Sequence, residues 1–366
     1  MKLKFLVVLL VLLLGLTYVS WGVYKLLPIP VVGKWVVVAL MLVAMSSMMG
    51  LFLFRGSNIS LNVEIVLYEV GTAWMIVMLY LFLAFLVLDI GNLCHLIPPT
   101  FNHESWIGTG TVAIFISGLL TYGNTRYRNK FRQELHLTTS KSLESPLKLV
   151  MVSDIHLGFH NRKAEFQRWV RLLNAENPDL ILIAGDIVDN SVKPIIQQHM
   201  ADDFKLLNAP IVASLGNHEY ISDVQESIRF IESAGITLLR DRAINIRGIN
   251  IVGRDDIMNM HRATLLSLTK DVDMSKFTIL LDHQPYHLEQ AQKAGIDFQF
   301  SGHTHRGQVW PISWITDSLF ECAFGSYKKG NTQYYVSSGL GIWGGKFRIG
   351  TRSEYIVATI ESHQKQ

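Results

Sequence analysis

Charge is scarce in this chain, and the shortage falls on one part of it. Charged side chains make up 17% of the 366 residues, whereas soluble proteins average about 25%. Residues 1–123 hold almost no charge, while residues 124–366 have the composition of an ordinary soluble protein. The shortage therefore predicts a membrane-embedded N-terminal part that is followed by a folded domain.

Cysteine and excess charge of either sign are also nearly lacking. Cys94 and Cys322, the only two cysteines, stand far apart, so they form neither the spacing of a thiolate metal site nor a disulfide framework. The formal net charge of +3 is too small to argue for binding to a polyanion. We therefore expect unreactive thiols and no nucleic-acid partner.

Four apolar runs fill the N-terminal part: Phe5–Tyr24, Trp35–Phe54, Val70–Leu88 and Ile107–Gly123. Each is close to the roughly 20 residues that cross a bilayer as a helix, although the fourth is shorter and richer in glycine. A competing interpretation of the first run is a cleaved signal peptide, but the run is too long and lacks a small-residue cleavage site. We predict a membrane anchor of four helices over residues 1–124.

Lysine and arginine predict the orientation of this anchor, because cytoplasmic loops are enriched in them. An N-terminus inside the cell leaves only Lys25 and Lys34 outside, and it places the others inside: Lys2, Lys4, Arg55, Arg126, Arg128, Lys130 and Arg132. If all four runs span, the chain is a multi-pass protein of the cell membrane, and its C-terminal domain lies in the cytoplasm. If Ile107–Gly123 does not cross the bilayer, that domain faces outside.

A polar and basic segment, residues 125–146, follows the anchor and is predicted to be a linker. Its lysines and arginines have two interpretations. They are typical of the inner end of a span, and they also suit the anionic headgroups of the cytoplasmic leaflet. The lipid bilayer is therefore an expected partner in either case.

Short apolar runs recur from Leu147 onwards, and each ends in a cluster of polar residues. Runs of this length are typical of buried strands, and they are Leu147–Val152, Leu180–Ala184, Ile211–Leu215, Phe277–Leu281 and Phe298–Phe300. A helical spacing of apolar residues over Ala164–Asn174 separates two of them. Ser222 with Gln225 resembles a capping box that opens a further helix, which Gly235 is placed to end. The alternation predicts an α/β fold.

The polar clusters after these strands contain the side chains that metal ions bind. In α/β folds such clusters gather at the carboxyl ends of strands, and here they offer Asp154, His156, Asp186, Asn217, His283, His303 and His305. A set of oxygen and nitrogen donors without thiolate suits Mn, Fe, Zn or Mg. The donors are too many for one ion but fit two, and two neighbouring ions need a shared ligand, for which a carboxylate is suited.

The order of these motifs resembles that of the calcineurin-like metallophosphoesterases over about residues 147–360. That family's pattern is D-x-H, G-D, G-N-H-[DE], H and G-H-x-H, and this chain supplies Asp154–His156, Gly185–Asp186, Gly216–Glu219, His283 and Gly302–His305. The resemblance implies a four-layer α/β/β/α sandwich over residues 147–362. It also implies two divalent metal ions as cofactors.

The resemblance further implies a role for each matched residue. Asp154, His156, Asp186 and His305 are expected to hold the first ion, and Asn217, His283 and His303 the second. Asp186 is expected to bridge the two ions, and His218 to protonate the leaving group without binding metal. A hydroxide between the ions would attack phosphorus, because metal ions lower the pKa of bound water towards neutrality.

A narrower similarity links Gly302–Gln308 and Tyr335–Gly341 to the membrane-associated branch of this family. That branch is similar to UDP-2,3-diacylglucosamine pyrophosphatases, but Arg306 stands here where glycine is usual. An arginine at this point can bind a second phosphate with two parallel hydrogen bonds. Arg306 is therefore a candidate for substrate binding. Arg254, which follows the apolar run Ile249–Gly253, and His160, which could line the pocket, are further candidates.

The sequence thus predicts a metal-dependent phosphohydrolase that cleaves a phosphoester or phosphoanhydride in a lipid-linked substrate resembling UDP-2,3-diacylglucosamine. Two alternatives remain open at this stage. The substrate could be a soluble nucleotide or a phosphoprotein, with the anchor serving only as a tether. Alternatively, the chain could be a membrane sensor or transporter whose metal-binding module does not turn over.

Overall fold

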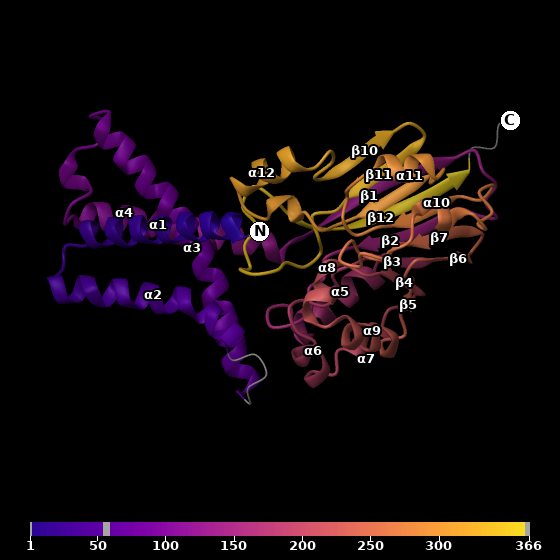
Figure 1. Ribbon diagram of the computed structural model, residues 1–366, viewed down its shortest axis with the longest axis horizontal. Helices are drawn as coiled ribbons and strands as arrows, with labels where there is room; N and C mark the ends of the chain where they lie inside the picture. The colour runs from indigo at the N-terminus through magenta and orange to yellow at the C-terminus, as the bar shows by residue number, and fades with distance from the viewer. Residues whose placement is uncertain (1, 54–58, 363–366) are drawn as a thin grey trace. The chain divides into compact units, whose positions relative to one another are not determined.

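The computed structural model describes residues 2–53 and 59–362, which divide into two compact units (Figure 1). We call the first the helical unit, and it contains Met1–Thr125 together with the short loop Gly344–Phe347. We call the second the sheet unit, and it contains Arg126–Trp343 and Arg348–Gln366.

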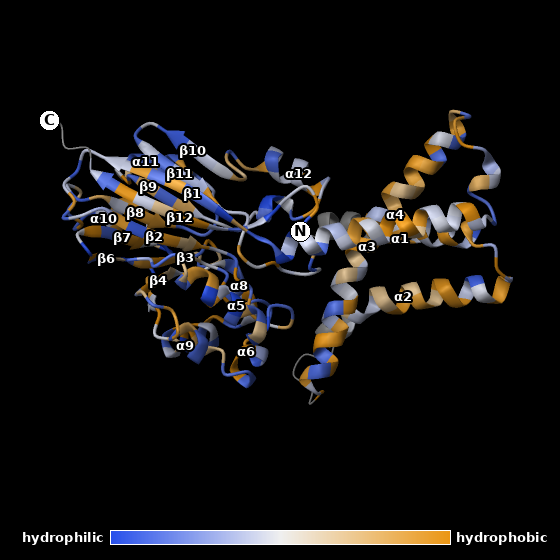
Figure 2. Ribbon diagram, turned by 180° about the vertical axis from the view of Figure 1, so that it is seen from behind, coloured by the Kyte–Doolittle hydropathy of each residue, from blue (hydrophilic) through white to orange (hydrophobic). Residues whose placement is uncertain are grey.

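The helical unit consists of long apolar helices, which are α1 (Lys2–Leu26), α2 (Val31–Leu53), α3 (Leu61–Leu93) and α4 (Trp106–Arg128), and the short 3₁₀ helix η1 (Pro99–Phe101). Leu40 and Val43 of α2 are exposed, and Figure 2 shows apolar residues along the surfaces of these helices. Large apolar side chains that face outwards along a whole helix are typical of a membrane environment.

Three helices of the described part are long and apolar enough to cross a membrane: Val31–Met48, Leu61–Leu93 and Trp106–Arg128. The predicted run Phe5–Tyr24 falls in α1, of which Leu10–Leu26 counts as a shorter apolar helix. Four spans are therefore not confirmed, whereas apolar N-terminal helices are. Arg55, which entered the prediction of orientation, lies outside the described residues.

Two mixed six-stranded sheets form the centre of the sheet unit. The first has the order β1-β12-β2-β3-β4-β5, with bounds β1 (Lys130–Thr139), β12 (Ser353–Ser362), β2 (Leu147–Val152), β3 (Leu180–Ala184), β4 (Ile211–Ser214) and β5 (Thr237–Leu238). The second has the order β10-β11-β9-β8-β7-β6, with bounds β10 (Gly325–Lys329), β11 (Thr332–Val336), β9 (Phe298–Ser301), β8 (Thr278–Leu281), β7 (Ile249–Gly253) and β6 (Arg242–Ile246).

The helices of the sheet unit connect these strands. They are α5 (Lys163–Asn174), α6 (Lys193–Gln197), α7 (Ala201–Phe204), α8 (Asn217–Ser222), α9 (Val224–Ser233), α10 (Leu265–Thr269), α11 (Glu289–Lys293), the 3₁₀ helix η2 (His305–Gly307) and α12 (Ile312–Leu319).

Alternation along the strands builds a layered core. In β2, Leu149 and Met151 pack between the two sheets, while Val150 and Val152 pack under Trp169 of α5, because successive side chains point to opposite faces of a strand. A third apolar cluster joins the second sheet to α10 and α11. These layers form a mixed α/β fold in which helices flank a pair of sheets, as the sequence predicted.

Two local predictions differ from the structure. Residues 130–139 of the predicted linker form β1, which pairs in parallel with β12 along its whole length and turns Leu137 into the core between the sheets. The helix α9 begins after Asp223 rather than at Ser222. The carboxylate of Asp223 accepts hydrogen bonds from the backbone N–H groups of Gln225 and Glu226, which a hydroxyl one residue earlier does not replace. Gly235, at φ +76°, follows the end of this helix, as predicted.

Candidate metal centre

The five polar clusters lie just beyond the carboxyl ends of β2, β3, β4, β8 and β9. The first three strands are neighbours in one sheet, and the last two are neighbours in the other. Side chains from both sheets meet where these ends face each other. The Oδ2 atom of Asp186, after β3, lies 3.0 Å from the Nε2 atom of His283, after β8.

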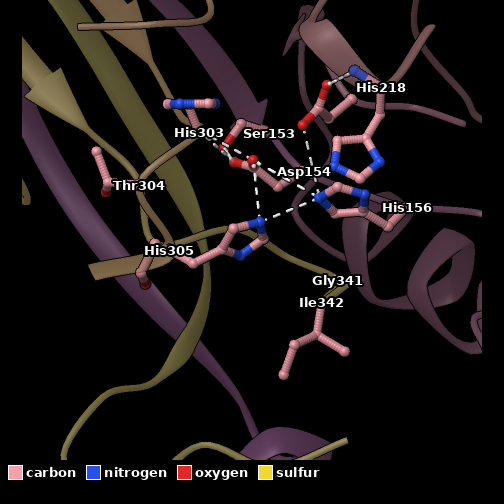
Figure 3. Close-up of polar contacts among 12 residues, drawn as sticks. Ser153, Asp154, His156, His218, His303, Thr304, His305, Gly341 and Ile342 are labelled. Atoms are coloured by element: carbon pink, nitrogen blue, oxygen red, sulfur yellow. Dashed lines mark hydrogen bonds and ion pairs between the residues drawn. The ribbon is translucent and has the colours of Figure 1, made fainter. Parts of the chain in front are cut away.

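One group of donors consists of Asp154, His156 and His305, all of which are buried (Figure 3). The Nε2 atoms of the two histidines are 3.0 Å apart, and Oδ1 of Asp154 lies 3.3 Å from Nε2 of His305. Two ring nitrogens at this distance compete for one proton, whereas a cation between them would satisfy the lone pairs of both. The geometry therefore fits a metal ion.

A second group consists of Asp186, His283 and His303, and Asn217 joins it. The Nδ1 atom of His303 lies 2.8 Å from Oδ1 of Asn217. In His283, Nδ1 lies 2.7 Å from the carbonyl oxygen of Ala184. Because a carbonyl only accepts, Nδ1 carries the proton, and the lone pair of Nε2 is left free for a metal. That buried Nε2 makes no hydrogen bond within the described part of the chain.

Asp186 connects the two groups. Its Oδ2 atom lies 3.7 Å from Nε2 of His156 in the first group, in addition to its contact with His283 in the second. Its other oxygen accepts a hydrogen bond of 2.9 Å from the backbone N–H of His218. A carboxylate that reaches both groups has the position that a ligand shared by two neighbouring ions requires. The donor types fit the divalent ions that the sequence predicts.

The backbone at these donors is strained. The structure gives Asp154, His156, Asp186, His303 and His305 φ angles between +47° and +71°, a region that costs a residue other than glycine about 1–2 kcal/mol. Such conformations persist only where the surrounding contacts enforce them, and they concentrate at functional sites. The strand ends are therefore shaped for the placement of these side chains rather than for local stability.

Two glycines let the loops approach the carboxylates closely. A Cβ atom on Gly216 would lie 2.2 Å from Oδ1 of Asp186, and one on Gly302 would lie 2.2 Å from Oδ2 of Asp154. Real side chains cannot be that close, so both positions require glycine. These glycines belong to the G-N-H and G-H-x-H motifs, which accounts for their place in the pattern.

His218 stands beside the two groups and contacts a carboxylate that the sequence analysis did not single out. Oδ1 of Asp189 lies 3.2 Å from Nδ1 of His218 and 3.4 Å from Nδ1 of His156. Burial alone would lower the pKa of His218, but Asp186 and Asp189 outweigh it and raise the pKa to about 9. The signal that could have revealed Asp189 is its position three residues after Asp186, on the same loop.

Three other residues have positioning roles that no local pattern predicted, although Glu219 belongs to the matched G-N-H-[DE] motif. Arg348 is completely buried; it donates a hydrogen bond of 2.8 Å to the carbonyl oxygen of His305, and its guanidinium lies 3.2 Å from Nδ1 of that ring. Asn161 donates 2.9 Å to the carbonyl of His156. The carboxylate of Glu219 accepts from the backbone of Gly216 at 2.7 Å and of Asp186 at 3.1 Å. All three hold donor-bearing loops in place.

The three substrate-binding candidates lie in different surroundings. His160 is buried. Arg254 is buried too, and its guanidinium lies 3.3 Å from Asp282 and donates 2.9 Å to Gln290, so its hydrogen bonds are used within the fold. Arg306 is half-buried next to His305, with its guanidinium 4.9 Å from the centre of the Phe324 ring. Of the three, Arg306 alone is not buried.

Comparison with known proteins supplies independent evidence. The family model described as calcineurin-like phosphoesterase matches residues 147–307. An uncharacterized metallophosphoesterase of Bacillus subtilis, YkuE, is 30% identical over 280 residues, which cover 69% of this chain and 96% of that protein. An uncharacterized metallophosphoesterase of Campylobacter jejuni is 30% identical over 227 residues, which cover 60% of each chain.

A vertebrate protein is also similar. The zebrafish protein named "transmembrane protein with metallophosphoesterase domain" is 31% identical over 227 residues, which cover 57% of this chain and 52% of that one. The matched part spans about six tenths of the length of the Campylobacter protein and about half of the zebrafish protein. The residues that the family model matches, 147–307, lie in the sheet unit and contain the donors.

Proposed function

Because the chain belongs to the calcineurin-like phosphoesterase family, we propose that it is a membrane-anchored hydrolase of phosphoester or phosphoanhydride bonds. Members of this family use two divalent metal ions, and the clustered aspartates and histidines fit that use. The single observation that carries the proposal is the position of Asp186 between two groups of buried donors, with His218 beside them.

In this proposal Asp154, His156 and His305 hold one ion, and Asn217, His283 and His303 hold the other, with Asp186 shared. When bound, the ions would supply a water of lowered pKa and would neutralise charge on the phosphoryl oxygens. The nitrogen and oxygen atoms that face each other in the two groups support this assignment. The mixed set of nitrogen and oxygen donors suits Mn, Fe, Zn or Mg.

His218 is proposed to give a proton to the leaving oxygen. Oδ1 of Asp189 lies 3.2 Å from Nδ1 of this ring, and its charge favours the protonated imidazole, whose other N–H is available to a substrate. A pKa of about 9 keeps this imidazole protonated at neutral pH, which is the form that a general acid needs. Arg306, half-buried and next to a metal-ligand candidate, is proposed to contact a phosphate group of the substrate.

We further propose that the substrate is attached to a lipid. Three apolar helices indicate a membrane protein, and a single residue, Asn129, separates α4 from β1, so the sheet unit is tethered directly to a candidate span. The motif similarity of Gly302–Gln308 supports a nucleotide-activated lipid of the UDP-2,3-diacylglucosamine type. The proposed division is an anchor over 1–124 with four spans and a cytoplasmic hydrolase domain over 147–362, and the basic segment 125–146 between them supplies the end of α4 and the strand β1.

The test uses the full chain in detergent and in nanodiscs with added Mn²⁺. Bis-p-nitrophenyl phosphate reports phosphodiester hydrolysis, and extracts of membrane lipids, followed by mass spectrometry, report cleavage of phosphate-containing lipids. The proposal expects both activities, with neither in the Asp186→Asn variant. Hydrolysis of bis-p-nitrophenyl phosphate without any change in the lipid extract would redirect the search to soluble nucleotides or phosphoproteins. An inert wild-type protein that still binds metal would point instead to a sensor module.

A further inference from the structure

Helix α12 (Ile312–Leu319) exposes apolar residues that a surface helix normally buries. Of this helix, all of which the structure describes, only Ser313 is buried. Trp314 is 65% exposed and Leu319 is 68% exposed, and Ile312 and Ile315 are exposed as well. A helix on the surface of a soluble domain normally buries its apolar face and exposes its polar one.

Other helices of the sheet unit follow the normal rule. In α5 the apolar residues Phe166, Trp169 and Leu173 are buried, and in α9 Phe230 and Ile231 are buried. The exposure of α12 is therefore not a property of this domain's helices in general. Contiguous exposed apolar residues on a soluble domain mark a surface that contacts a protein or a membrane.

The helix is joined closely to the metal centre. It begins five residues after Gly307, the end of η2, which itself starts at the donor His305. Beyond its other end, the ring of Phe320 lies 6.2 Å from the ring of His303 and 4.9 Å from that of Tyr286. At its start, Trp310 packs edge-on against Trp314 at 5.4 Å. A contact on α12 is thus made next to the place where the substrate is expected to react.

Two observations identify the partner as a lipid surface rather than a protein. First, α4 ends at Arg128 and β1 begins at Lys130, so the sheet unit cannot move more than a few residues' length from a candidate span, and the bilayer is present at high effective concentration. Second, tryptophan with aliphatic residues is the apolar face typical of helices that lie in the membrane interface. Arg126 and Arg128 at the end of α4 add the positive charge that anionic headgroups attract.

We propose that α12, together with Trp310, is a membrane-docking surface that inserts into the headgroup region and holds the metal centre against the bilayer. The occupant is the lipid surface itself. This inference rests on the membrane anchoring in the proposed function but not on the hydrolase activity. Its functional consequence is that a phosphate group at the membrane surface reaches Asp186 and His218 without leaving the lipid.

Depth-resolved fluorescence on the full chain tests this proposal. In a background of Cys94→Ser and Cys322→Ala, a single environment-sensitive label is attached to Leu319→Cys in α12. Matched variants carry the label at Leu266→Cys in α10, which is also exposed and lies at the opposite end of the sheet unit in both views (Figures 1 and 2), and at Val43→Cys in the apolar α2. Each is reconstituted into nanodiscs of phosphatidylcholine and phosphatidylglycerol in equal parts.

We expect the label at position 319 to shift its emission to the blue and to be quenched by lipid-borne nitroxides, as at position 43, while aqueous iodide quenches the label at position 266. Quenching of position 319 by iodide to the same extent as position 266 would overturn the proposal. Protection from both quenchers would also overturn it, because a protein surface would then cover the helix. If position 43 itself escapes the lipid nitroxides, the proposed anchoring fails, and the docking proposal fails with it.

Discussion

The two units of this chain use the same apolar residue types in opposite ways. In the helical unit, valines and leucines such as Val32, Leu40 and Val43 face outwards, whereas in the sheet unit Leu149, Ile181 and their neighbours are completely buried. Helix formation does not explain the difference, because α5 and α9 are helices and bury their apolar faces. The surroundings explain it, since apolar side chains turn away from water and towards lipid or a protein core alike.

Polar groups differ between the units as well. The sheet unit collects buried carboxylates and imidazoles from both sheets at one edge, with backbone and side-chain groups holding each donor. In the helical unit, Tyr18 donates to Asp89 at 2.6 Å and Lys34 pairs with Glu104 at 2.6 Å. These contacts satisfy single groups, and the described residues of this unit contain no cluster of metal donors. The comparison implies that the sheet unit carries the reactive groups and that the helical unit holds the protein at the membrane.

The largest expected effect compares one carboxylate from each unit. Asp186→Asn should lower Mn²⁺-dependent turnover of bis-p-nitrophenyl phosphate by roughly a thousandfold or more, because it removes the negative charge shared by both donor groups. Asp89→Asn should leave turnover per folded protein close to that of the wild type, since Asp89 contacts Tyr18 in the helical unit. A similar loss of turnover in both variants would contradict the claim that only the sheet unit takes part in the chemistry.

The second-largest effect is expected when an exposed apolar residue of each unit is replaced by arginine. Val43 in α2 and Leu206 in the sheet unit are both well exposed. Val43→Arg, near the middle of an apolar helix, should raise the free energy of membrane insertion by about 2.5–3.5 kcal/mol, as measured by the inserted fraction in a translocation assay. Leu206→Arg should change the free energy of unfolding by no more than about 0.5 kcal/mol. Undiminished insertion of the Val43→Arg chain would contradict a bilayer around α2.

Smaller effects are expected when a glycine of each unit is replaced by alanine. Gly216→Ala forces a Cβ atom against Asp186, and we expect Mn²⁺ affinity to fall by about 10–100-fold, as read from the metal dependence of turnover. Gly110→Ala in α4 meets open space and should stabilise its helix by up to about 1 kcal/mol. Wild-type Mn²⁺ affinity in Gly216→Ala would show that the close approach does not matter to the site.

The smallest expected effect is a change in pH dependence. The pKa of His218 is raised to about 9, so the acid form is present below that pH, and its contribution is lost as the pH rises through it. Asp189→Asn removes one of the charges that raise this pKa, and the alkaline decline of turnover should therefore move to lower pH. Asp202→Asn, which changes an exposed acid of the sheet unit, should leave the profile in place. An unchanged profile in Asp189→Asn would remove His218 as the titrating acid.

The strands and donors were predictable because each signal is local. Leu180–Ala184 is an uninterrupted apolar run, and Leu147–Val152 is interrupted only by Lys148. The bounds of the two runs match β3 and β2, and the metal-binding residue types follow shortly after them. The carboxyl ends of neighbouring parallel strands necessarily meet at one edge of a sheet, so local patterns were enough to place Asp154 beside Asp186.

The remaining features depend on contacts that no local pattern encodes. Leu135 and Leu137 of β1 alternate with polar residues, and their partner strand lies at the other end of the chain. Arg348 has a role only because carbonyl oxygens from separate loops converge on it in the folded state, including those of His305 and Gly341. The apolar residues of α12, Ile312, Ile315 and Leu319, have the spacing of a helix that buries one face, and only the structure reveals that this face is exposed. Asp189, by contrast, could have been inferred from its spacing to Asp186.

The most direct test of the central claim is the metal content of the purified full chain after equilibration with Mn²⁺ and removal of excess ions. Elemental analysis should find two ions per chain, as the family uses, and a clear loss of bound metal in Asp186→Asn. The Asp186→Asn chain should still be recovered from the membrane fraction before purification, so that the loss of metal is specific to the sheet unit. A wild-type chain without bound metal, or an Asp186→Asn chain with the full complement, would contradict a two-ion site shared through Asp186.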